Sequence, residues 1–229
     1  MVSGPSSSRQ VCLTFDDGPG RAYTPRVLDM LRAHAVRATF FLLGKNAAAH
    51  PHLVRRIAAE GHAIANHTFS HFPAEQVSAR QFFEETVQTR RLLEELVGRP
   101  PRLLRPPFGK LTVGKLSHSW RAMHTVVLWN NDPKDFASQS AQQVRDWFDE
   151  HPLAGGQIVL LHGYCPYLVK VLPDVIADAR RRGLEFTTVD SWVHSPLLQG
   201  AQQWTAESSW SHTFFRPSAA PACNARPNS

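Results

Sequence analysis

Short, β-rich apolar runs recur along most of the chain, and helical patterns fill most of the gaps between them. This alternation predicts a parallel sheet covered by helices, which places the chain in the α/β class. Seven such units suggest a barrel, although the pattern alone also fits an open doubly wound sheet. In both architectures reactive residues gather after the carboxyl ends of the strands. The seven runs are Val11–Phe15, Ala38–Leu42, His62–Asn66, Arg102–Leu104, Thr125–Trp129, Gln157–Leu161 and Glu185–Val189.

Several helix boundaries can be placed from capping signals. Thr24 followed by Pro25 predicts an N-cap with proline at the first helical position. Ser78 and Gln81 have the spacing of a capping box, and Gly98 is expected to end the helix that they start.

Size and composition predict one main domain with extensions at both ends. A chain of 229 residues, 42% of them hydrophobic, can bury the core of a single α/β domain. We expect a flexible segment over residues 1–9, the domain over residues 10–193, and an extension and tail over residues 194–229. No apolar run reaches the roughly eighteen residues of a membrane-spanning helix, so no membrane span is expected.

The residues from Met1 to Gln10 are small and polar and do not resemble a signal peptide. The protein is therefore expected to be cytoplasmic if Met1 is its native start, and secreted if the chain is a trimmed mature form. The sequence gives no indication of the oligomeric state.

The three cysteines, Cys12, Cys165 and Cys223, are widely spaced and form no C-x-x-C pair. This pattern indicates neither a zinc ribbon nor a disulfide framework. Cys12 lies in an apolar run and is expected to be a buried free thiol.

The net charge of +6 raises the question of an anionic partner such as nucleic acid. However, the arginines are spread over amphipathic helices, and no nucleic-acid-binding motif accompanies them. A basic, solvated surface accounts for the charge, and no nucleic-acid partner is expected.

Carboxylates and histidines follow two of the apolar runs. Asp16 and Asp17 end the first run, where a solvated turn would be the ordinary interpretation if they stood alone. His67 and His71 follow the third run at a spacing that places both rings on one face of a helical turn, although a surface pair is common. Two histidines and one carboxylate, with Asp17 as its source, fit a catalytic zinc site that has an open position. The same ligands suit non-haem iron, but those oxygenases are usually all-β.

Further polar groups end the later runs. Arg105 begins an Arg-Pro-Pro-Phe segment that holds it rigidly. A buried arginine needs a carboxylate, which Asp16 could supply, although an arginine that bridges two loops is the plainer alternative. His162 closes the sixth run at the same expected edge of the sheet.

Five motifs occur in a characteristic order: TFDDGP, HTFSH, RPPF, the D-P-K-D-F segment and LLH. In this order they resemble the polysaccharide deacetylases that share the NodB homology domain, carbohydrate esterase family 4. The resemblance spans Val11 to Trp192, which is most of the chain. It implies a distorted (β/α)7-type barrel and an acetylated carbohydrate or sugar-like molecule as the substrate.

The resemblance implies one divalent metal ion held by Asp17, His67 and His71. Zn²⁺ is the expected ion, with Co²⁺ or Ni²⁺ as alternatives. Asp16 would act as the base that takes a proton from a metal-bound water, whose pKa the ion lowers from about 15.7 towards about 7–9. The backbone N–H of Phe108 would stabilise the oxyanion that forms.

The same resemblance gives roles to the remaining motif residues. His162 would be the general acid for the departing amine or alcohol, and Asp135 would pair with it and raise its pKa. Asp132 lies close enough in sequence to compete for that role. Arg105 would orient Asp16, and Leu160 would line a small pocket for the acetyl methyl group.

Two residues depart from the family pattern. Phe108 stands where a tyrosine is usual, which leaves the backbone donor in place. Phe136 stands where many members have a tryptophan that shapes the substrate groove, which makes the match to chitin, xylan and peptidoglycan enzymes less close.

Three functions follow from these observations. The first is metal-dependent hydrolysis of an N-acetyl or O-acetyl group on a carbohydrate. The second is a cytoplasmic deacetylase or deformylase of a small sugar-like metabolite, and the third is a catalytically inactive carbohydrate-binding domain. The third is disfavoured because every expected metal ligand and the expected base are present.

Overall fold

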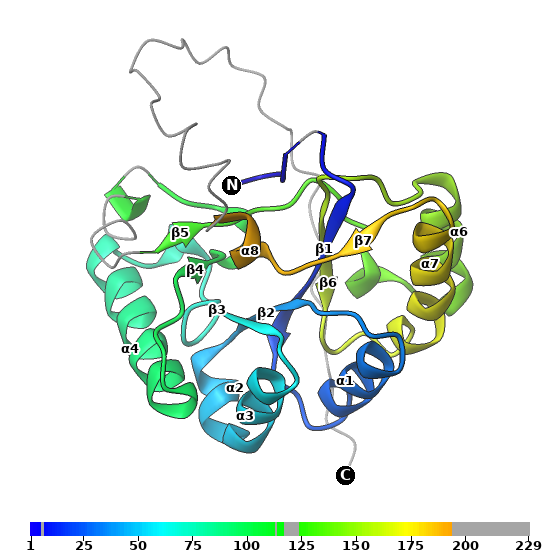
Figure 1. Cartoon of the computed structure of the whole chain (residues 1–229). Helices are drawn as coiled ribbons and strands as arrows, with labels where there is room; N and C mark the ends of the chain where they lie inside the picture. Colours follow the sequence, from blue (N-terminus) through cyan, green and yellow to red (C-terminus); the bar gives the residue numbers. More distant parts are fainter. Residues whose placement is uncertain (6, 113, 117–123, 194–229) are drawn as a thin grey trace, which may run out of the picture. The chain divides into compact units, whose positions relative to one another are not determined.

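The computed structural model describes residues 1–5, 7–112, 114–116 and 124–193, and in these ranges seven parallel strands are surrounded by helices (Figure 1). Each strand falls on one of the predicted apolar runs. The predicted extension over residues 194–229 lies outside the described residues. The strands are β1 (Gln10–Gly18), β2 (Thr39–Leu42), β3 (Ala63–Asn66), β4 (Leu103–Leu104), β5 (Thr125–Val126), β6 (Ile158–His162) and β7 (Glu185–Phe186).

The sheet has the strand order β5-β4-β3-β2-β1-β6, and β7 pairs with the start of β1. Beyond β5 the chain leaves regular strand geometry but still reaches β6. Asn131 forms a parallel bridge with Val159, and its carbonyl accepts a hydrogen bond from the Leu160 N–H at 2.8 Å. The curled sheet is therefore joined between its two ends by an irregular segment, which confirms the predicted distorted barrel over an open doubly wound sheet.

The alternation of side chains along β1 separates the core from the inside of the barrel. Val11, Leu13 and Phe15 belong to the apolar core shared with the helices. Because successive side chains of a strand point to opposite faces, Thr14 and Asp16 face the other way, into the barrel. Both are buried, so the interior of the barrel contains polar groups that need partners.

The helices lie around the strands (Figure 1), and their ends agree in part with the capping signals. The Ser78–Gln81 capping box is present, and Gly98 ends its helix in the left-handed conformation, with φ of 73°. Tyr23, however, is the N-cap of the first helix, because the Thr24 hydroxyl accepts the Gly20 N–H instead. The helices are α1 (Thr24–Ala33), α2 (Gly44–Ala49), α3 (Pro51–Ala59), α4 (Ala79–Val97), α6 (Ala141–Glu150), α7 (Leu168–Arg181) and α8 (Val189–Val193), with short 3-10 turns η1 (Ala74–Gln76), η2 (Pro107–Gly109) and η3 (Asp135–Ala137).

Cys12 and Cys165 are buried and unbridged, as expected for Cys12. Within the described ranges, no helix is both long enough and apolar enough to cross a membrane.

The N-terminal segment makes specific contacts with the barrel, while the flexibility expected for residues 1–9 stays a prediction. The Met1 ammonium group donates to the Val126 carbonyl at 2.6 Å, and burial lowers the pKa of this group. The Gly4 N–H donates to the Gly156 carbonyl at 2.8 Å. This segment thus lies against the chain on both sides of the irregular closure.

We predict that Gly155→Ala destabilises the fold. A Cβ atom at this position would lie 1.8 Å from the Ser8 carbonyl oxygen, and a backbone atom cannot rotate away. The expected loss is about 1–3 kcal/mol of unfolding free energy, measured by urea denaturation. Gly20→Ala is the control, because no heavy atom lies within 4 Å of its Cβ position. Equal stability of the two variants would contradict the packing described for the N-terminal segment.

Candidate active site

The carboxyl ends of four strands bring the predicted polar residues to one edge of the barrel. Asp16 lies near the end of β1, and His162 is the last residue of β6; the two are paired in the strand register. His67 directly follows β3, and Arg105 directly follows β4. The expectation that reactive residues gather at this edge is met by the geometry.

Asp17, His67 and His71 converge on one point. The Asp17 Oδ1 atom lies 3.4 Å from Nε2 of His67 and 3.3 Å from Nε2 of His71, and all three ligand atoms lie within 4.8 Å of one another. A tetrahedral ion with bonds of about 2.0–2.1 Å separates its ligand atoms by about 3.3–3.4 Å. The two measured separations therefore match a divalent cation of this geometry.

Hydrogen bonding fixes which nitrogen of His67 faces Asp17 with a lone pair. The Nδ1 atom of His67 lies 2.7 Å from the Arg105 carbonyl oxygen, which can only accept, so Nδ1 carries the proton. The Nε2 atom of the neutral ring then presents a lone pair to the Asp17 carboxylate. Among the described residues, the buried Asp17 Oδ1 atom has no hydrogen-bond partner. Electron pairs that face one another in a buried site are stabilised by a cation, so these residues fit a metal ion.

The pKa values of the three groups are shifted in different directions. Burial raises the pKa of Asp17, but the interaction with His67, together with the nearby His71 and His162, outweighs burial and brings the pKa to about 2. Burial disfavours the charged form of His67, yet the charges of Asp16 and Asp17 raise its pKa. Burial lowers the pKa of His71, which keeps this ring neutral and able to bind a metal.

Asp16 has a different partner from its neighbour. The fully buried Arg105 guanidinium donates through Nη1 to Asp16 Oδ1 at 2.7 Å and to the Thr14 hydroxyl at 2.8 Å. Its carbon centre lies 4.0 Å from the centroid of the Phe41 ring, a cation–π contact. The second carboxylate oxygen of Asp16 lies 3.7 Å from Nε2 of His67, on the side of the converging Asp17 and histidines.

His162 is held by Asp135 through two hydrogen bonds. The ring Nδ1 atom and the backbone N–H of His162 each lie 2.8 Å from an oxygen of the Asp135 carboxylate. Asp132 instead pairs with the Lys134 ammonium at 2.5 Å, so Asp135 is the partner of the histidine. Burial lowers the pKa of His162, but Asp135 outweighs burial and the net shift is upward.

Aromatic and apolar side chains surround these groups. The Phe108 ring lies 4.9 Å from the His71 ring, and the Phe136 ring lies 5.0 Å from the His162 ring. Leu160 is buried two residues before His162 and faces the same side of β6. The positions of Phe108, Phe136 and Leu160 are compatible with the predicted substrate contacts, whose roles stay predictions.

Two residues at the site were not singled out in the sequence. Tyr164 is half exposed and its ring lies 5.5 Å from that of His162. Glu85, on α4, accepts hydrogen bonds from the backbone between His67 and His71. Glu85 sits in an amphipathic helix among other charged residues, so its sequence context carries no sign of this contact.

Backbone strain is concentrated in the motifs. Of the six non-glycine residues with positive φ in the described ranges, all but Ala35 lie in the loops that carry the site. Such conformations cost on the order of 1–3 kcal/mol each and persist where surrounding contacts impose them. The five site residues are Asp17, Thr68, His71, Phe108 and Lys134.

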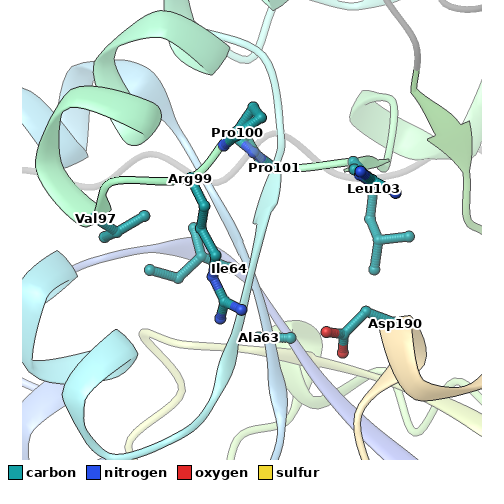
Figure 2. Close-up of a pocket in the computed structure, with 9 residues that line it drawn as sticks. Ala63, Ile64, Val97, Arg99, Pro100, Pro101, Leu103 and Asp190 are labelled. Carbon is teal, nitrogen blue, oxygen red and sulfur yellow. The ribbon is translucent and has the colours of Figure 1, made fainter. Parts of the chain in front are cut away.

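A cavity of about 350 Å³ lies at the other end of the strands (Figure 2). Its lining includes Ala63 and Leu103, the first residues of β3 and β4, together with Arg99 and Asp190. None of its lining residues belongs to the converging groups. The chemistry described above is therefore confined to the carboxyl edge of the barrel.

Comparison with known proteins agrees with this geometry. The profile of the polysaccharide deacetylase family matches residues 3–127. The chain belongs to this family. A peptidoglycan-N-acetylglucosamine deacetylase from Bacillus cereus is 36% identical over 193 residues, which cover 82% of this chain and 70% of that protein. A chitooligosaccharide deacetylase from Bradyrhizobium is also 36% identical, over 79% of this chain and 89% of that protein.

The fold is also shared with solved members of the family. The crystal structure of a peptidoglycan N-acetylglucosamine deacetylase bound to a naphthalenyl-N-oxidanyl-benzamide superposes with a TM-score of 0.80 at 35% identity, over 83% of this chain and 91% of that chain. The predicted family, carbohydrate esterase family 4, and the predicted enzyme class, a carbohydrate deacetylase, are thereby confirmed.

We predict that Arg105→Ala strongly destabilises the protein. The substitution leaves the buried Asp16 carboxylate without its counter-charge, which typically costs about 3–5 kcal/mol. Urea denaturation measures the loss. Arg80→Ala is the control, because the Arg80 side chain is 88% exposed and its pairing with Glu84 is screened by water. A loss at Arg105 no larger than at Arg80 would contradict the structural role of the buried pair.

Proposed function

We propose that this protein hydrolyses the N-acetyl group of an amino sugar within a carbohydrate, with a divalent metal ion as cofactor. One observation supports this above the others: Asp17, His67 and His71 converge, while the adjacent Asp16 is held by Arg105 with one oxygen turned towards them. This arrangement separates a metal-binding carboxylate from a carboxylate that can accept a proton.

The metal triad would hold Zn²⁺, or alternatively Co²⁺ or Ni²⁺, and the bound ion would supply Lewis acidity to a water molecule and to the acetyl carbonyl. Asp16 accepts the proton of the attacking water. Arg105 keeps the Asp16 carboxylate oriented for this transfer through the 2.7 Å ion pair. The Phe108 backbone N–H donates to the oxyanion, and such a donor is typically worth about 3–4 kcal/mol.

His162 completes the reaction by protonating the departing amine. An amide nitrogen is a poor leaving group without this proton, so a positioned acid is required. Asp135 raises the pKa of His162 and fixes its Nδ1 atom, which leaves Nε2 to face the substrate. Leu160 forms the floor of the space for the acetyl methyl group.

The relatives support N-acetylglucosamine-containing carbohydrates as the substrate class, because their names specify peptidoglycan N-acetylglucosamine and chitooligosaccharides. A small acetylated or formylated sugar-like metabolite is the second candidate, favoured by phenylalanine at position 136. An inactive binding domain is disfavoured by the retention of the three converging ligands and of Asp16.

We predict that Asp16→Asn abolishes turnover while zinc still binds. The asparagine amide keeps the shape of the side chain but cannot accept a proton, so acetate release should fall by at least about 100-fold. Acetate release from N-acetylglucosamine oligomers by the zinc-loaded protein measures turnover, and calorimetry measures zinc binding. Thermal unfolding monitors the fold, because the variant removes the counter-charge of Arg105.

Asp29→Asn is the matched control, since this carboxylate is 57% exposed and forms ion pairs with Arg32 and Arg56, away from the converging groups. Unchanged turnover in Asp16→Asn would refute its role as base. No acetate release by the metal-loaded wild-type protein from any acetylated sugar would refute the proposed function.

We predict that Asp135→Asn shifts the alkaline limb of the pH–rate profile to lower pH. The acid must be protonated to act, and its protonated fraction falls as the pH rises through its pKa. Because Asp135 raises the pKa of His162, removal of its charge should move the descending limb of kcat/KM to lower pH. Asp132→Asn should leave the limb in place, since Asp132 pairs with Lys134. The reverse result would assign the histidine to Asp132.

A further inference from the structure

The loop between the two histidine ligands has an unusual backbone. Thr68 and His71 both adopt positive φ, at 66° and 63°, which β-branched and bulky residues rarely do. Relaxation of either residue would turn the chain and move the His71 imidazole relative to that of His67. The distance between the two ligands therefore depends on contacts that hold the loop in this conformation.

The loop carbonyls are all bonded to one neighbouring segment. The Gly44 N–H donates to the Thr68 carbonyl at 2.9 Å, and the Lys45 N–H donates to the Phe69 carbonyl at 3.1 Å. The Lys45 ammonium donates to the Ser70 carbonyl at 3.3 Å. The start of α2 thus fixes one side of the loop.

The loop N–H groups are bonded to two side chains. Asn66 Oδ1 accepts the Thr68 N–H at 2.9 Å. A single atom, Glu85 Oε2, accepts both the Phe69 N–H at 3.0 Å and the Ser70 N–H at 2.8 Å. One side-chain oxygen therefore holds two successive N–H groups of the loop.

Glu85 projects from a well-anchored helix. Helix α4 begins with the Ser78 capping box. The backbone carbonyl of Thr86, the residue that follows Glu85 in this helix, accepts a hydrogen bond from the Asn66 side-chain amide at 2.8 Å. Asn66 directly precedes the ligand His67. Two adjacent residues of α4 therefore bind the two ends of the same short segment, and the helix acts as a fixed support for it.

We infer that Glu85 is a positioning residue for the metal site: by accepting two N–H groups through one oxygen, it sets the loop that holds His67 and His71 at ligand distance. The inference rests on the proposed function, since it concerns affinity for the proposed divalent cation. Glu85 does not touch the metal, and its effect passes through the backbone. Loss of a group that orients a metal ligand typically weakens metal binding about 10–100-fold.

Substitutions at position 85 distinguish the contribution of the acceptor atom to metal binding from that of the negative charge. Glu85→Gln keeps an oxygen at the same reach without the charge, so it should bind metal within about threefold of wild type. Glu85→Ala removes the acceptor, and Glu85→Asp keeps the charge but shortens the side chain by one methylene. Both should weaken zinc binding by about 10–100-fold. Glu84→Ala, on the same helix with a side chain that is 56% exposed, should bind zinc as wild type does.

Zinc affinity is measured on the metal-free full chain by competition with a chromophoric chelator, and the visible spectrum of bound Co²⁺ reports ligand geometry. Circular dichroism and thermal unfolding establish that each variant is folded. If Glu85→Ala does not fold, Glu85→Asp provides the same comparison. Wild-type zinc affinity in Glu85→Asp and in any folded Glu85→Ala would overturn the inference. So would an equal loss in Glu85→Gln, which would assign the effect to charge alone.

The two proposals fail differently. If the wild-type protein and the variants at position 85 bind zinc equally well, the positioning role of Glu85 is refuted and the proposed deacetylase reaction is unaffected. If the variants show the expected order of zinc affinities but the wild-type protein releases no acetate from any acetylated sugar, the proposed reaction is refuted and the positioning role of Glu85 is retained. Wild-type protein that binds no zinc, cobalt or nickel overturns both.

Discussion

Arg105 is the residue through which the parts of the site are joined. Its guanidinium binds Asp16, its carbonyl accepts the Nδ1 proton of His67, and its backbone N–H donates to the Asn66 carbonyl at the end of β3. A buried arginine is unfavourable unless its donors are satisfied, and here a carboxylate, a hydroxyl and backbone carbonyls accept from it. The orientation of Asp16, the proposed base, and the tautomer of His67, a proposed metal ligand, thus depend on the Arg105 side chain and its own peptide group.

The two adjacent aspartates have the same side chain but different partners, because they face different sides of the chain. Asp16 faces the barrel interior, where Arg105 neutralises it, while Asp17 has positive φ and turns its carboxylate towards the histidines. Two neighbouring carboxylates in one environment would oppose each other's ionisation. Each carboxylate instead has partners of its own, which the proposed reaction needs.

Much of this architecture could be predicted from the sequence, because it is encoded locally. Strand positions follow from apolar runs, and the gathering of polar groups follows from a rule of parallel sheets. The family resemblance pointed to Asp135 as the partner of His162, but the residues alone left Asp132 as a competitor, since a left-handed turn at Lys134 lies between the two carboxylates. Glu85 could not be found either, because its partners lie 15 and 16 residues away in the chain. The packing of the N-terminal segment on β5 and on the turn before β6 likewise involves distant residues.

The left-handed residues of the motif loops have a consequence for engineering. Exchanges to glycine at Thr68 or Lys134 would relieve the cost of the left-handed backbone, while they increase the conformational entropy of the unfolded chain. At this rim they would also let the loops sample other shapes, so a gain in heat resistance would be accompanied by a less ordered catalytic edge. Substitutions that raise thermostability are better placed around the amino ends of the strands, away from the converging site residues.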